Sequence, residues 1–201
     1  MFEACPILNF APTIILASAS PRRQELLRQV GIGFEVLAAN LEETRRPHES
    51  PVEYVQRVAA DKARYVAGLA TVRGRPVLGA DTEVVVEDEV LGKPRDRAHA
   101  AQLLRRLSGR THTVLSALCL VLPASEHRRL SESRVRFAVL SDAEIENYVA
   151  SGEADDKAGA YAIQGRAASF IVRLEGSYSG VMGLPLYELR EILQQAGMEY
   201  S

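Results

Sequence analysis

Residues 13–31 read TIILASASPRRQELLRQVG, and they decide the fold because they join an apolar strand to a helix through a turn rich in hydroxyl groups. Pro21 suits the first helical position and Gly31 suits the stop, so we predict a helix over about residues 21–30. The first N–H groups of a helix are unpaired and lie at its positive dipole end, where they attract anions. Further donors come from the side chains of Ser18, Ser20, Arg22 and Arg23. The stretch therefore predicts an anion-binding site suited to phosphate.

The composition is that of an ordinary globular protein whose ligand is small. The 201 residues are 47% hydrophobic, enough to bury a core, and show no repeat, low-complexity tract or linker. We therefore predict one domain over residues 1–201, with residues 1–12 as an N-terminal extension. The 24 basic and 26 acidic residues give a net charge of -2, so no global positive field favours a nucleic-acid partner.

Cysteine usage and hydropathy predict a soluble cytoplasmic protein with no membrane partner. Cys5 and Cys119 are too far apart for a metal-type pair, and so few thiols favour a reducing compartment. Residues 4–19 are largely apolar, like a secretion signal, but no Lys or Arg precedes them and Pro6 and Pro12 interrupt them. No other stretch reaches the length of a membrane span.

Capping patterns predict the remaining helices. The clearest is Ser50-Pro51-Val52-Glu53, a capping box with proline at the first helical position, followed by apolar residues at helical spacing. We predict helices that begin at Ser50, Asp96, Ser141 and Pro185 and end near residue 68, Gly109, Gly152 and Gly197.

Runs rich in Val and Ile predict the strands. Residues 84–86 and 90–91 flank an acidic turn like a hairpin, and residues 123–128 resemble a turn between two long antiparallel strands. The predicted strands are residues 13–17, 34–38, 76–80 continuing to 86, 112–122, 132–140, 160–164 and 168–174. The mixture predicts an α/β fold whose central sheet is mixed, partly antiparallel and flanked by helices.

The histidines show no zinc-ligand spacing, so the sequence supports neither a zinc site nor a His-based triad. We expect each of them on the surface or in a turn. They are His48, His99, His112 and His127.

Several polar residues occupy positions where the sequence pattern predicts an apolar core residue or an ordinary turn residue. Lys62 falls within the apolar stripe of the helix after Ser50; either its stem covers the core edge, or its ammonium points at an anion in a pocket. Asp81 follows an apolar strand, where an acid can hold a metal or a base or can begin an Asx turn. Strand alternation places Glu83 on the same face.

Three further residues have equally open readings. Lys93, between Gly92 and Pro94, either aims an ammonium inward or lies in a solvated turn. Glu43 belongs to a charged loop and could supply a metal-binding oxygen. The amide of Gln164 can match the edge of a base or can cap a loop.

Six ordered motifs resemble the Maf family of nucleoside triphosphate pyrophosphatases from Ile14 to about Leu193. They are Ser18-Ala19-Ser20-Pro21-Arg22-Arg23, Gly79-Ala80-Asp81-Thr82, Leu91-Gly92-Lys93-Pro94-Arg95, Leu107-Ser108-Gly109-x-Thr111-His112, Lys157-Ala158-Gly159-Ala160-Tyr161-x-Ile163-Gln164-Gly165 and Gly176-Ser177-Tyr178-x-x-Val181-x-Gly183-Leu184-Pro185. The resemblance implies a Maf/ITPase-like fold with a deep cleft between two lobes, a cytosolic homodimer, and a divalent cation, Mg²⁺ or Mn²⁺. It also implies hydrolysis of nucleoside triphosphates to the monophosphate and pyrophosphate.

The resemblance also assigns roles to individual residues. Asp81 matches the proton acceptor, and Glu43 matches an acid of the cleft. We expect Glu43 and Asp81 to hold the metal together with phosphate oxygens. The residues that match the polyphosphate-binding set are Ser18, Arg22, Lys62 and Lys93. Arg23, Thr82 and Gln164 match the specificity positions of the branch that acts on dTTP and UTP. Glu83 departs from the family pattern, in which we expect an aliphatic residue.

Two other functions fit the same motifs. One is a nucleotide-binding regulator of cell division or septum formation that binds without significant turnover. The other keeps the chemistry but acts on another modified nucleotide, such as 7-methyl-GTP.

Overall fold

The computed structural model describes residues 13–198, so the predicted extension over residues 1–12 lies outside the described residues. A seven-stranded sheet has the order β2-β1-β3-β5-β6-β7, with β4 paired to β3. Its strands are β1 (Ile14–Leu16), β2 (Phe34–Val36), β3 (Val77–Val86), β4 (Glu89–Leu91), β5 (Thr111–Val121), β6 (Glu126–Phe137) and β7 (Ile171–Glu175). β1 runs parallel to β2 and β3, and every other pair is antiparallel, which confirms the predicted mixed sheet.

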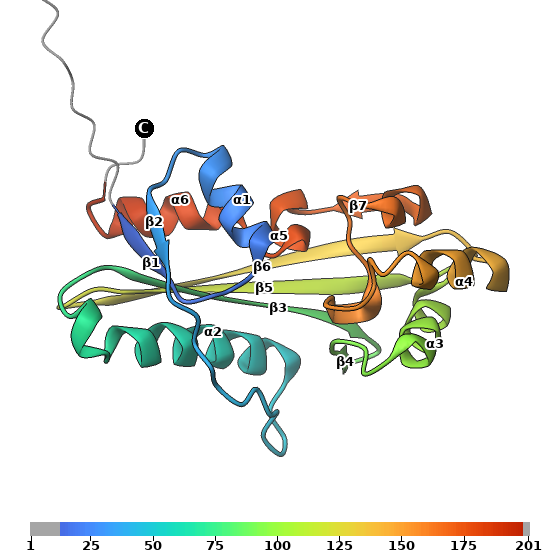
Figure 1. The fold of residues 1–201 in the computed structure, drawn as a ribbon, viewed down its shortest axis with the longest axis horizontal. Helices are drawn as coiled ribbons and strands as arrows, with labels where there is room; N and C mark the ends of the chain where they lie inside the picture. Colours follow the sequence, from blue (N-terminus) through green and yellow to red (C-terminus); the bar gives the residue numbers. More distant parts are fainter. Residues whose placement is uncertain (1–12, 199–201) are drawn as a thin grey trace, which may run out of the picture.

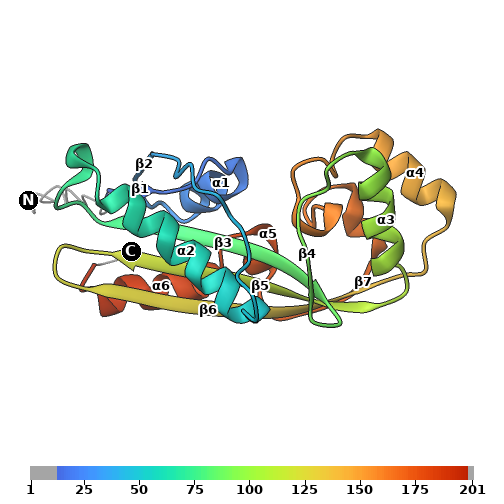
Figure 2. The same ribbon diagram turned by 90° about the horizontal axis from the view of Figure 1, so that it is seen from below.

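Helices cover both faces of the sheet (Figure 1). They are α1 (Pro21–Gln29), α2 (Pro51–Ala67), α3 (Arg97–Leu107), α4 (Asp142–Ala150), α5 (Tyr178–Met182) and α6 (Leu186–Gln195), with 3₁₀ turns η1 (Ala70–Val72), η2 (Ala158–Ala160) and η3 (Arg166–Phe170). α2 packs alone on one face, while α1, α5 and α6 lie on the other. Figure 2 shows that α3 and α4 gather at one end of the long strands and form a second lobe.

The predicted helix starts are confirmed because caps are local interactions. Ser50 accepts a hydrogen bond from the backbone N–H of Glu53, whose carboxylate accepts one in return, and Ser141 and Glu144 repeat the arrangement. Asp96 caps the start of α3. α1 begins at Pro21 as predicted, although its capping residue makes no side-chain capping bond. Within residues 13–198, no helix is long and apolar enough to cross a bilayer.

The predicted hairpin between β3 and β4 is confirmed. Its two central residues, Glu87 and Asp88, have φ angles of 51° and 64°. Two positive φ angles are what a type I′ turn requires, and this turn matches the twist of the flanking strands.

Three predicted strands, residues 132–140, 160–164 and 168–174, differ from the structure. β6 starts at Glu126 rather than at residue 132, because Arg64 of α2 and Arg128 both pair with Glu126 and satisfy its charge within the strand. β6 also ends at Phe137, and Val139 beyond it is 85% exposed.

Residues 160–164 form no strand. Gly159 and Ala160 have φ angles of 66° and 59°, so the chain turns through η2 where extended backbone was expected. The last predicted strand, residues 168–174, begins later, at Ile171.

α2 lies unusually close to β3. A Cβ atom on Gly79 would overlap the carbonyl oxygen of Ala59 and would stand 2.8 Å from the Cβ of Ala63. Glycine on the strand and alanines on the helix therefore set the spacing between the two elements. Lys62, between the two alanines, is brought within reach of the strand.

Candidate active site

A gap in the edge of β3 shapes the candidate site. β1 pairs with β3 at Val77 and Leu78, and β4 pairs with the same strand at residues 84–86. Between them, residues 79–83 pair only with β5 among the strands that the structure describes. A cavity of about 980 Å³ opens against this gap. Asp81 was expected at the end of a strand; it lies within one, and the cleft exists because the neighbouring strands are short.

The cavity brings together all nine residues that the sequence singled out for the site. They are Ser18, Arg22, Arg23, Glu43, Lys62, Asp81, Thr82, Lys93 and Gln164. They come from the turn before α1 and the first turn of α1, the loop after β2, α2, β3, the segment after β4, and the turn before η3. The cleft between two lobes is therefore present, and the individual roles of these residues stay predictions.

Lys62 is the bridge between two acids. Its Nζ atom lies 2.8 Å from Oδ1 of Asp81 and 2.9 Å from Oε1 of Glu43. Lys62 is only 7% exposed, so its ammonium does not reach bulk water. The interpretation in which the stem of Lys62 merely covers the edge of the core is therefore wrong. Removal of the Lys62 ammonium would leave the carboxylate of Asp81 buried without its partner, which would lower the stability of the fold.

The acids outnumber the bridging cation. Glu83 is buried on the same strand face as Asp81, as alternation predicted, and burial, followed by the charges of Asp81 and Glu43, raises its pKa to about 8. Oδ2 of Asp81 and Oε2 of Glu83 are buried with no hydrogen-bond partner among the described residues.

The unpartnered oxygen of Asp81 is the kind of donor that a divalent cation takes. No group of three or more His, Cys, Asp or Glu side chains within residues 13–198 could hold a metal ion by itself. Magnesium usually takes one or two carboxylates together with phosphate oxygens, so a site of this kind is complete only with a phosphate ligand.

The two neighbouring arginines are held in different ways. Arg23 is buried and donates from Nε to the carbonyl of Gly183 (2.9 Å), from Nη1 to Oγ of Ser18 (2.8 Å) and from Nη2 to Oγ1 of Thr82 (3.5 Å). Nε of Arg22 is buried without a partner among the described residues. Burial, followed by the charge of Arg23, lowers the pKa of Arg22. In the first turn of α1, Arg23 is thus held in place, while Arg22 has an N–H donor with no partner among the described residues.

Comparison with known proteins decides the family. The family model described as "Maf-like protein" matches residues 13–196. The chain belongs to the Maf-like protein family. A dTTP/UTP pyrophosphatase of Shewanella oneidensis is 51% identical over 191 residues, which cover 92% of this chain and 98% of that protein. The dTTP/UTP pyrophosphatase of Escherichia coli O157:H7 is 52% identical over 182 residues, with 90% and 91% covered.

Solved structures show a more distant likeness to this Maf-like chain. The Ham1 protein of Staphylococcus aureus aligns with a TM-score of 0.42 and 16% identity over 65% of this chain and 72% of that one. Protein VC0702 of Vibrio cholerae aligns with a TM-score of 0.37 and 12% identity, with 72% and 79% covered.

The second lobe of the Maf-like cleft has an aromatic base. The hydroxyl of Tyr161, which lines the cavity, lies 2.8 Å from Nε2 of His112, and both rings pack edge-on against Phe137. His112 is 2% exposed, so its expected place on the surface was wrong. Burial lowers the pKa of His112 to about 4 and keeps the ring neutral. Position within an amphipathic strand, rather than spacing to other ligands, was the signal for this histidine.

A buried hydroxyl chain is the part of the site that the sequence analysis missed. Oγ of Ser116 donates to the carbonyl of Gly180 at 2.6 Å, so it must accept from Oγ1 of Thr82 at 2.9 Å. Thr82 in turn accepts from Arg23, which gives the chain one direction. Ser116 is fully buried, and a hydroxyl amid the apolar run of β5 was the available signal.

Proposed function

We propose that this protein is a nucleoside triphosphate diphosphatase that hydrolyses dTTP and UTP to the monophosphate and pyrophosphate. One observation carries the proposal: Lys62 fixes one oxygen of Asp81, and the other oxygen has no partner within residues 13–198 and belongs to a residue lining the same cavity as Arg22 and Lys93. A buried carboxylate with one fixed and one free oxygen is suited to orient a water molecule. The relatives named dTTP/UTP pyrophosphatase support the choice of substrate.

In the proposed reaction, water attacks the α-phosphorus and pyrophosphate leaves. Oδ2 of Asp81 accepts a hydrogen bond, and then the proton, from the attacking water. Arg22 and Lys93 stabilise the charge that develops on the leaving pyrophosphate, which is electrostatic and positioning work. Lys62 has three N–H donors and uses two on Asp81 and Glu43, so one is left for a phosphate oxygen.

Glu43 and Asp81 are the residues that we propose to hold Mg²⁺ or Mn²⁺ together with the phosphates. A divalent cation held by these residues would neutralise phosphate charge and polarise the bond that breaks. Glu43 is the more exposed of the two acids, with a side chain 36% exposed against 6% for Asp81. It can therefore adjust to the incoming cation, while Asp81 stays fixed.

Selection of the base is proposed to rest on Gln164, Arg23 and Thr82. The amide of Gln164, which lies exposed at the cavity, can pair with the carbonyl and imide N–H of thymine or uracil. Arg23 and Thr82 contact each other, so we expect them to affect selectivity together.

We also propose a cytoplasmic homodimer that binds neither nucleic acid nor membrane. The supporting features are the balanced charge of the chain and its likeness to the Maf family. Light scattering after size exclusion tests the dimer, and a monomeric mass at micromolar concentration contradicts it.

A panel of nucleoside triphosphates tests the function. Purified protein is incubated with Mg²⁺ and dTTP, UTP, 7-methyl-GTP or a purine triphosphate, and the products are identified. We expect dTMP and UMP with pyrophosphate. Phosphate in place of pyrophosphate would mean that a different bond breaks, binding without product would favour a regulator, and preference for 7-methyl-GTP would overturn the choice of base.

A further inference from the structure

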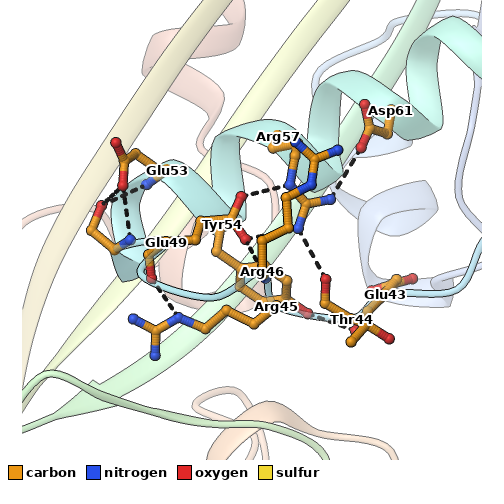
Figure 3. Close-up of polar contacts among 10 residues, drawn as sticks. Glu43, Thr44, Arg45, Arg46, Glu49, Glu53, Tyr54, Arg57 and Asp61 are labelled. Carbon is orange, nitrogen blue, oxygen red and sulfur yellow. Dashed lines mark hydrogen bonds and ion pairs between the residues drawn. The ribbon is translucent and has the colours of Figure 1, made fainter.

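The loop that carries Glu43 is fastened to α2 at two consecutive peptide groups. The hydroxyl of Tyr54 donates to the carbonyl of Glu43 at 2.9 Å, and Nη2 of Arg57 donates to the carbonyl of Thr44 at 3.1 Å (Figure 3). Residues 37–46 form neither helix nor strand, so their backbone carbonyls have no partners of their own element. Tyr54 and Arg57 are three residues apart and lie on one face of the helix.

Arg57 is itself held rigidly. Its Nε and Nη2 atoms contact the two oxygens of Glu49 at 2.5 and 2.8 Å, and Nη1 contacts Asp61 at 3.2 Å. The hydrogen bond from Arg57 lowers the pKa of Glu49 to about 2. Glu49 lies near the end of the same loop that precedes α2, and it also accepts from the backbone N–H of Arg46 at 3.0 Å. The guanidinium therefore ties the middle of the loop, at Thr44, and this end, at Glu49, to α2.

The position of Glu43 depends on this fastening. Its side chain is 36% exposed and is not walled in by packing, yet its carboxylate lies 2.9 Å from Lys62. Lys62 belongs to the same helix as Tyr54 and Arg57, about two turns after Tyr54. One helix thus supplies both the cation and the anchors.

We propose that Tyr54 and Arg57 are positioning residues, which hold the backbone of residues 43 and 44 so that the Glu43 carboxylate stands beside Asp81 ready for the divalent cation. This inference rests on the proposed function, in which Glu43 helps to hold that cation. Neither side chain reaches the reacting phosphorus; both act through Glu43.

Tyr54→Phe is the cleanest test because it removes one hydroxyl and keeps the ring. Loss of one positioning hydrogen bond predicts about a three- to tenfold rise in the Mg²⁺ concentration that gives half-maximal dTTP hydrolysis. Binding of dTTP in EDTA should stay unchanged. Arg57→Ala removes two anchors and should raise the Mg²⁺ requirement further, with partial rescue by Arg57→Lys.

A double-mutant cycle separates positioning from general damage. If Tyr54 acts through Glu43, Tyr54→Phe has no further effect on the Mg²⁺ requirement in a Glu43→Gln background. The same factor in both backgrounds, or no effect in either, overturns the proposal. Arg64→Ala is the matched control: Arg64 lies on the same helix and pairs with Glu126 of β6, and it has no hydrogen bond or ion pair with the described loop residues 37–50. The Mg²⁺ requirement of this variant should match that of the wild type.

Binding of Mn²⁺ gives a readout that needs no turnover. Electron paramagnetic resonance of Mn²⁺, with a dTTP analogue that carries a methylene bridge between the α and β phosphates, should show the same rise in dissociation constant for Tyr54→Phe. Wild-type protein that binds Mn²⁺ and analogue but releases no pyrophosphate from dTTP would refute the proposed function alone. Unchanged Mn²⁺ binding in Tyr54→Phe and Arg57→Ala would refute the positioning role alone.

Discussion

Two clusters of side chains contribute to the cavity, and they differ in the charge that they carry. In the charged cluster (Glu43, Lys62, Asp81 and Glu83), one ammonium pairs with Asp81 and Glu43, while burial raises the pKa of Glu83 to about 8. One carboxylate oxygen of Asp81 and one of Glu83 have no partner among the described residues. In the aromatic cluster (His112, Phe137 and Tyr161), burial lowers the pKa of His112 and raises that of Tyr161, so both groups stay neutral. Burial therefore favours the neutral form in the aromatic cluster and at Glu83, while Lys62 remains paired with two carboxylates at the cavity.

The largest expected effect comes from the charged cluster. Asp81→Asn keeps the shape of the side chain but removes the proton acceptor, so we expect kcat for dTTP to fall by about 10²- to 10⁴-fold. Calorimetric titration with dTTP should show binding retained within a few-fold. Near-normal turnover in Asp81→Asn would take the catalytic role away from this residue.

Lys62→Met breaks the ion pairing without removing bulk. Because Asp81 then loses its partner while buried, we expect unfolding free energy to fall by about 3–5 kcal/mol. Urea denaturation at neutral pH measures this change. In the double variant with Asp81→Asn much of the loss should return, and a loss of equal size in the single and double variants would argue against the pairing.

Glu83→Gln tests the charged cluster through the pH dependence of the melting temperature. In the folded protein the pKa of Glu83 is raised to about 8, above its ordinary value of 4.5, so the stability that this group contributes is full below 4.5 and declines as pH rises toward 8. The variant should therefore melt at a higher temperature than wild type at pH 8 and at the same temperature near pH 4. A melting difference that does not vary with pH would contradict this account.

Tyr161→Phe tests the aromatic cluster, and its effect should be the smallest. The variant loses the hydrogen bond to His112, which predicts a loss of roughly 1 kcal/mol in unfolding free energy with kcat little changed.

In wild type, the contribution of His112 to the free energy of unfolding is present above pH 6.5 and is lost as pH falls toward 4, because the unfolded chain takes up the proton first. His112→Gln should flatten the stability profile between those values.

Local chemistry explains which parts could be read from the sequence. The helix starts at Ser50, Asp96 and Ser141 depend on residues within one turn, and all three were predicted correctly. Lys62 stood out because a cation interrupted an apolar stripe, and the structure gives that cation two buried acids as partners.

Tertiary placement explains what could not be predicted. Ser116 contacts Thr82 only because the register of β3 with β5 places the two residues opposite each other. Arg57 reaches the loop only after α2 has packed, and nothing in the helix pattern separates it from a solvated arginine. Gly159 with a positive φ overrode the apolar run that follows it, and so a strand was expected where the chain turns.

The five-residue notch in the edge of β3 has a consequence for the behaviour of the protein in a crowded solution. A bare strand edge is a template on which foreign chains can add and aggregate. Here β1 and β4 stand at either end of the notch on the same side, so an incoming strand would collide with both before it could align. A small ligand can therefore reach the unpaired edge of residues 79–83, whereas a β-strand of another molecule cannot pair with it.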